Sequence, residues 1–188
     1  MDAVLNFLTR LYTETPWIYL SWPAAAMVAG TIFGALWSAG LQHLGIVPRT
    51  AAGLLGIVTG PFLHANAAHL LANLPPFVGL GYLVLQRNEG NFLEVAGTIT
   101  LATGLLVWLA ARKAAHVGMS GVIFGFLGYL VAVAWFTRTT PDLLVGGGVL
   151  LFYGGMLAGV APVRGSTSWE SHLFGLLAGI ARAWWELG

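Results

Sequence analysis

The stretch Gly118-Met119-Ser120-Gly121-Val122-Ile123-Phe124-Gly125 opens a long apolar segment and places a serine hydroxyl at its head. Polar side chains within membrane-spanning segments are costly, so each one is a candidate functional residue that needs a partner. Three more polar side chains lie near the starts of two other apolar segments, namely His69, Asn73 and His172. These four side chains are therefore candidates for a single site.

The composition indicates an integral membrane protein. Of 188 residues, 57% are hydrophobic and 8% are charged, whereas a soluble domain carries about 25% charged residues. The mean hydropathy is +0.81. A formal net charge of +1 without a basic run excludes nucleic acid as a partner. The absence of cysteine excludes disulfides, thiolate metal ligands and a cysteine nucleophile.

Six segments are long enough to cross about 30 Å of hydrocarbon at 1.5 Å per residue. They run over about 18–40, 67–85, 92–110, 119–136, 142–160 and 171–187. The connections are short, so the pattern predicts an all-α membrane protein in which residues 18–188 form one six-helix bundle. Residues 1–17 carry Asp2, Arg10 and Glu14 around short apolar runs, which predicts an interfacial amphipathic segment and not a signal peptide.

The parity of the segments places the polar side chains on one side of the membrane. The second, fourth and sixth segments run in the same direction, so their starts share a face. Helix N-termini carry unpaired N–H groups and the positive end of the helix dipole, which favour an oxyanion. The positive-inside rule does not orient the bundle, because arginine and lysine divide four against four between the two sides.

The glycines around Ser120 have a packing interpretation that supports a chemical one. Gly121, Gly125 and Gly128 form one stripe, and Gly175 and Gly179 form a small-residue pair. On its own, the Gly-x-Ser-Gly pattern could simply mark a helix contact. Close packing of the two segments would, however, also bring Ser120 near His172.

Ser120 and His172 fit a nucleophile and its base. A serine hydroxyl needs a base within hydrogen-bond reach to attack near neutral pH. The nearby carboxylate, Glu170, is expected in the preceding loop, so the prediction is a Ser–His dyad without an orienting acid. The alternative is that His172 is a hydrogen-bonded core histidine.

His69 and Asn73 are four residues apart and share one helix face. Their donors could stabilise an oxyanion, or they could form an interhelical hydrogen bond worth about 0.6–2 kcal/mol. His64 is expected in the preceding loop as a supporting residue. A metal site of His64, His69 and His172 is poorly supported, because no carboxylate or thiolate completes the set. No cofactor is predicted.

These motifs together resemble the rhomboid family of intramembrane serine proteases. They are His64-Ala65-Asn66-Ala67-Ala68-His69-Leu70-Leu71-Ala72-Asn73, then Gly118-Met119-Ser120-Gly121, then His172-Leu173-Phe174-Gly175 followed by Gly179. The resemblance covers about residue 45 to the C-terminus. It implies a Ser120–His172 dyad and an oxyanion site built from His69, Asn73 and the Ser120 N–H. It also implies access from the extracytoplasmic side, with both termini in the cytoplasm of a prokaryotic cell.

The chain departs from the family pattern at three places. Its first loop, roughly residues 41–63, is short and lacks the Trp-Arg pair of many relatives. Gln86 stands where many members have a glutamate, and Phe124 stands where a tyrosine is common. Phe124 can still stack on the His172 ring. None of these changes removes a reacting group.

The function expected from these observations is cleavage of membrane-anchored proteins in or beside a transmembrane helix. The partners would be such a substrate and the lipid bilayer; the oligomeric state is not predicted. A catalytically silent rhomboid-like protein that binds membrane helices is the alternative, against which the four intact polar side chains argue. A small-solute transporter is disfavoured because no internal repeat is evident and the polar groups gather near one face.

Overall fold

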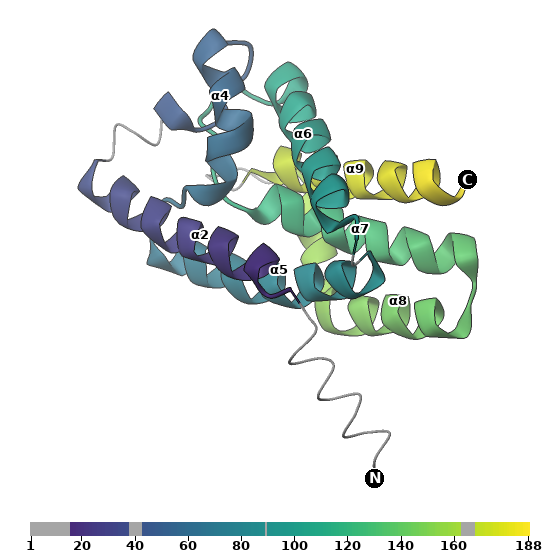
Figure 1. The fold of residues 1–188 in the computed structure, drawn as a ribbon. Helices are drawn as coiled ribbons and strands as arrows, with labels where there is room; N and C mark the ends of the chain where they lie inside the picture. Colours follow the sequence, from purple (N-terminus) through teal and green to yellow (C-terminus); the bar gives the residue numbers. More distant parts are fainter. Residues whose placement is uncertain (1–15, 38–42, 89, 163–167) are drawn as a thin grey trace.

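The structure is a computed structural model that describes residues 16–37, 43–88, 90–162 and 168–188 (Figure 1). The proposed interfacial segment therefore lies, apart from residues 16 and 17, outside the described residues. The described elements are, in order, α2 (Ile18–Leu36), α4 (Ala51–Thr59), η1 (Gly60–Phe62), α5 (Ala67–Arg87), α6 (Phe92–Ala110), α7 (Ser120–Thr137), α8 (Thr140–Tyr153), η2 (Gly154–Val160) and α9 (Trp169–Leu187).

Over the residues that the structure describes, each of the six predicted segments contains a helix, which confirms the all-α membrane fold. Five are long and apolar enough to cross a membrane, namely α2, α5, α6, α7 and α8 continued through η2. The sixth, α9, is 19 residues long, the same length as α2. It carries Glu170, Arg182 and Glu186, and this charge sets it apart from the other five.

The expected first loop contains a further helix. Thr50 caps α4, because its hydroxyl accepts a hydrogen bond from the N–H of Gly53 at 3.1 Å. The Arg49 guanidinium donates to the carbonyls of Leu109 and Ala111, each at 2.9 Å, at the end of α6. At nine residues α4 is too short to span a membrane, and a search for spanning lengths misses it.

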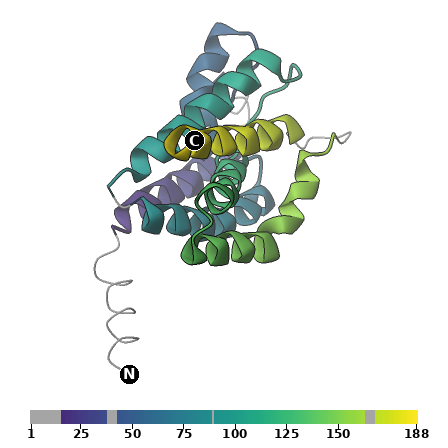
Figure 2. The same ribbon diagram turned by 90° about the vertical axis from the view of Figure 1, so that its right-hand side faces the viewer.

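Helices α5, α7 and α9 run in the same direction, away from the end of the molecule that holds α4, and α8 returns antiparallel to them (Figure 1). This arrangement agrees with the parity prediction. Figure 2 shows α7 end-on, surrounded by the other helices. In α7, 72% of the residues are buried, compared with 33% or fewer in the other four candidate spans. Ser120 therefore begins the central helix.

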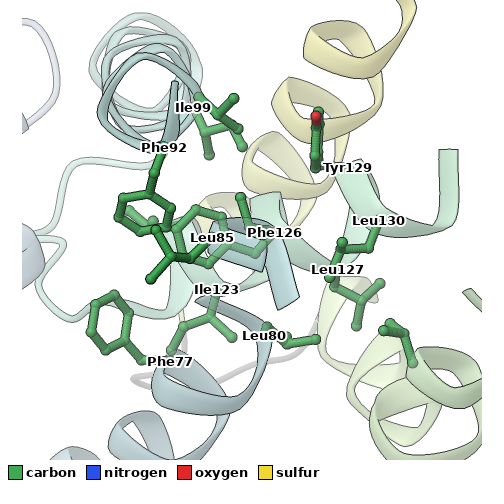
Figure 3. Close-up of a cluster of buried hydrophobic side chains, with 14 of the residues drawn as sticks. Phe77, Leu80, Leu85, Phe92, Ile99, Ile123, Phe126, Leu127, Tyr129 and Leu130 are labelled. Carbon is green, nitrogen blue, oxygen red and sulfur yellow. The ribbon is translucent and has the colours of Figure 1, made fainter. Parts of the chain in front are cut away.

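The hydrophobic core joins α5, α6 and α7 through aromatic contacts (Figure 3). The ring of Phe126 lies 6.4 Å from that of Phe77 and 6.0 Å from that of Phe92 between centroids. At the end of the bundle far from α4, Arg182 on α9 pairs with Glu94 on α6 at 3.2 Å. These contacts hold the helices that carry the candidate site residues.

Candidate functional site

The contact between α7 and α9 is made by glycines packed against backbone. A Cβ added to Gly175 would overlap the Gly121 carbonyl oxygen, and one added to Gly179 would overlap that of Gly125. The glycines of α7 also lie close to the backbone of α9, since a Cβ on Gly121 would lie 3.3 Å from the Ser171 carbonyl oxygen. The predicted close contact between these two helices is confirmed.

His172, in the first turn of α9, is held from two sides. Its Nδ1 lies 3.0 Å from the carbonyl oxygen of Gly159 in η2. A carbonyl oxygen can only accept, so Nδ1 carries the proton and Nε2 of the neutral ring is left as the acceptor. The ring stacks on Phe124, with centroids 4.3 Å apart and an interplanar angle of 7°. The stacking expected from the sequence is therefore present.

Ser120 is the first residue of α7 and is half-buried. The turn before it depends on Gly118, whose φ of +111° disfavours any side chain. The N–H of Gly118 donates to the carbonyl of Gly60 at 2.9 Å, which anchors the turn. Within the described chain no hydrogen bond joins Ser120 to His172; such bonds are often long in a free enzyme and shorten only with substrate.

His69 reaches the Ser120 turn from α5. A Cβ added to Gly118 would lie 2.7 Å from Nε2 of His69, so the imidazole packs against the Gly118 backbone. The first turn of α9 reaches the same region through the contact of the Ser171 carbonyl with Gly121. The structure thus brings together the parts of three helices that carry Ser120, His69 and His172.

His64 supports His69 from the segment between η1 and α5. It is 1% exposed, and its ring meets that of His69 edge-on, with centroids 5.0 Å apart. Burial, then the neighbouring His69, lowers the pKa of His64 to about 4, against the opposing effect of the Phe62 backbone. His64 is therefore neutral near pH 7 and adds no charge beside His69.

Asn73 lies one turn beyond His69 on α5 and is buried. Its amide nitrogen donates to the His69 carbonyl at 2.8 Å, while its Oδ1 has no partner among the described residues. One amide hydrogen is thus committed to the helix and one is left to donate elsewhere. The Asn66 side chain caps α5 by accepting from the His69 N–H at 2.8 Å.

Two features of the site differ from the sequence-based expectation. Glu170 was expected in a loop, which is wrong: it lies in the first turn of α9, is 5% exposed and pairs with Arg112 at 3.5 Å. The group that orients His172 is the backbone carbonyl of Gly159, which no side-chain pattern could reveal. In the described part of the chain, no three His, Cys, Asp or Glu residues gather closely enough to hold a metal ion.

Comparison with known proteins agrees with the fold. A family model for the rhomboid domain matches residues 51–188. An uncharacterized protein of Mycobacterium tuberculosis is 38% identical over 149 residues, which cover 74% of this chain and 62% of the relative. A Mycobacterium leprae protein is 37% identical over 140 residues, 70% of this chain and 55% of the relative. The chain therefore spans less than two thirds of these relatives' length.

A plant protein shows a more local similarity. Rhomboid-like protein 11 of Arabidopsis thaliana, described as chloroplastic, is 38% identical over 93 residues, which cover 47% of this chain and 33% of the relative.

Proposed function

The chain belongs to the rhomboid family, and we propose that it is an intramembrane serine endopeptidase that uses a Ser120–His172 dyad. Its substrates would be membrane-anchored proteins, cleaved in or next to their transmembrane helix. The observation that carries the proposal is the tautomer of His172. The Gly159 carbonyl fixes the proton on Nδ1. Nε2 is therefore free to accept the proton of the Ser120 hydroxyl at the start of the neighbouring helix α7.

In the proposed reaction, Oγ of Ser120 attacks the scissile carbonyl while its proton passes to Nε2 of His172. The tetrahedral intermediate places its oxyanion beside the N-terminus of α7, where the Ser120 N–H and the helix dipole favour negative charge. His69 and the uncommitted amide hydrogen of Asn73 are the proposed further donors. His172 then gives its proton to the leaving amine. In the second half of the reaction His172 takes a proton from water, which attacks the acyl-enzyme, and returns it to Oγ of Ser120 as the acid product leaves.

In this proposal the Gly159 carbonyl takes the place of an orienting carboxylate. In soluble serine hydrolases an acid fixes the tautomer of the histidine and stabilises the imidazolium. Here the Gly159 carbonyl accepts from Nδ1, and the Phe124 ring covers one face of the imidazole. A ring face over a cation is also favourable when His172 becomes protonated.

The decisive experiment measures cleavage of a transmembrane model substrate by purified protein in liposomes. Ser120→Ala and His172→Ala should each abolish cleavage, and the double variant should be scarcely worse, because nucleophile and base act as a unit. Ser21→Ala, at an exposed position on α2, is the matched control and should cleave normally.

A fluorophosphonate probe separates a protease from a catalytically silent relative. Wild-type protein should be labelled at Ser120, and the label should be lost in His172→Ala. Retained cleavage in Ser120→Ala would falsify the serine-protease assignment. A wild type that neither cleaves nor labels would favour the silent, helix-binding function.

The proposal includes an orientation. We place both termini in the cytoplasm of a prokaryotic cell, so that the starts of α5, α7 and α9 face the extracytoplasmic side. Fusing a periplasm-active and a cytoplasm-active reporter to the C-terminus tests this placement, since only the cytoplasmic reporter should be active.

A further inference from the structure

A second polar group lies beside the proposed dyad and takes no part in the reaction above. It joins the segment between α6 and α7 to the start of α9, and we call it the His116 cluster; it consists of Arg112, His116, Ser168, Glu170 and Ser171. His116 is 3% exposed and Glu170 is 5% exposed. Buried polar side chains are costly unless they are bonded, so the bonds of this cluster need an explanation.

The hydrogen bonds of the His116 cluster form one chain with a single direction. Nε2 of His116 lies 3.0 Å from the Arg112 carbonyl oxygen, which can only accept, so Nε2 carries the proton. Nδ1 must then accept from the Ser168 hydroxyl at 2.5 Å. The Ser168 oxygen in turn accepts from the Ser171 hydroxyl at 2.6 Å.

Glu170 adds a second tie to the same segment. One carboxylate oxygen lies 3.5 Å from Nε and 3.5 Å from the backbone nitrogen of Arg112. The Arg112 carbonyl thus contacts His116, while the side chain and backbone N–H of Arg112 contact Glu170. The other carboxylate oxygen is buried and has no hydrogen-bond partner among the described residues.

The segment that holds α9 is itself anchored. His116 and Ile46 exchange both backbone hydrogen bonds at 2.9 Å, and Gly118 bonds to Gly60 two residues later. The His116 cluster therefore bonds the first turn of α9 to a segment whose own position is held by backbone hydrogen bonds. On its other side, the same turn meets Gly121 through the Ser171 carbonyl.

The charge state of His116 suits this chain. Burial lowers the pKa of His116, against opposing effects of the Arg112 carbonyl and Glu170, while the Arg112 charge acts in the same direction as burial. A neutral ring near pH 7 has the one donor and one acceptor that the two hydrogen bonds require.

We propose that the His116 cluster is a set of positioning residues that fixes the rotation and axial position of the first turn of α9, and so aims Nε2 of His172 at Ser120. The inference rests on the proposed function. Its basis is that Ser168, Glu170 and Ser171 lie in the turn that immediately precedes His172. Ser168 and Glu170 are bonded to the segment that leads into Ser120, and Ser171 is bonded to Ser168.

The kinetic test compares His116→Leu, which removes both side-chain bonds, with His116→Gln, whose amide can donate to Arg112 and accept from Ser168. A displacement of about 1 Å in a reacting group can cost a hundred-fold in rate. We expect His116→Leu to lower kcat by about thirty- to a hundred-fold with KM within about two-fold, and His116→Gln to recover at least ten-fold of that loss. His43→Leu, at an exposed histidine outside the cluster, should match wild type.

A second measurement does not depend on proteolysis. The 15N resonances of the imidazoles, in protein labelled at histidine, report the tautomer and hydrogen bonds of His172. We expect His116→Leu and the milder Ser168→Ala to shift the His172 signals, and His43→Leu to leave them unchanged. If neither variant shifts them, or if kcat stays at the wild-type level in both, the cluster does not position His172.

The two proposals fail in different ways. If wild-type protein does not cleave and Ser120 is not labelled, the proposed function fails, while shifted His172 signals in Ser168→Ala still support the positioning role. If cleavage requires Ser120 but His116→Leu merely lowers the melting temperature, the proposed function stands and the positioning inference is wrong.

Discussion

Glycines on α7 and two of the glycines on α8 lie in opposite surroundings. On α7, Gly121 and Gly125 meet the backbone or side chains of α6 and α9 so closely that an added methyl group has no room. On α8, Gly147 and Gly148 have no atom within 4 Å of such a methyl group. The side chains around them on α8 face outward, with Leu144 73% and Leu151 78% exposed.

This contrast shows which glycines determine the relative position of two helices. Where glycines of two helices face each other, the backbones approach to contact distance and their relative position has little freedom. The α7–α9 contact is of this kind, and it holds the two helices that bear Ser120 and His172. Gly147 and Gly148 of α8 face open space, whereas Gly146 packs against Ala134 of α7. Helix α8 continues into η2, which contacts His172 through Gly159.

The largest expected effect comes from disrupting the close contact between α7 and α9. Gly175→Ala adds one methyl group that would overlap the Gly121 backbone, although alanine is the better helix former by about 1 kcal/mol. We expect at least a hundred-fold loss of cleavage together with a lower melting temperature, measured in the same detergent. Normal cleavage by Gly175→Ala would show that the glycine contact does not set the dyad geometry.

A smaller effect is expected on α5, which reaches the site through the His69 side chain and not through glycines of two facing helices. Asn73→Ala and His69→Ala should each reduce turnover by roughly ten- to a hundred-fold without abolishing it, because each supplies part of the oxyanion stabilisation. Rates measured beside Ser120→Ala set the scale. Full activity in both variants would return these residues to a packing role.

Gly159 is the point at which the continuation of α8 meets the site. A Cβ there would lie 3.0 Å from Nδ1 of His172 and 3.2 Å from the Phe124 ring. We expect Gly159→Ala to lower kcat by about ten-fold, because the imidazole must tilt, and to leave the melting temperature unchanged. A pronounced thermal destabilisation would mean that η2 is as tightly packed as the α7–α9 contact.

The smallest effect is expected at Gly147, the matched control for Gly175. The same change to alanine meets open space, so cleavage and melting temperature should both stay close to wild type. A loss comparable to that of Gly175→Ala would remove the distinction between the two helices.

The sequence singles out the candidate site residues more readily than their supports. Ser120, His69 and His172 are conspicuous because they are polar groups among apolar residues, and Phe124 because it stands one turn after Ser120 where a tyrosine is common in the family. Helix α4 was missed because its apolar run is too short to span a membrane. Glu170 was placed in a loop because nothing local marks the start of α9 two residues earlier.

Local properties can be read from the amino-acid sequence: the hydropathy that makes the segments helical and membrane-embedded, the parity that puts three helix starts on one face, and the glycine spacing that permits close packing. Which groups meet depends on the way the helices pack. The Gly159 carbonyl orients His172, and His116 grips the turn before it, across 13 and more than 50 residues of chain. Such contacts depend on how whole helices dock, because a carbonyl or a buried imidazole carries no sign of its partner in the sequence around it.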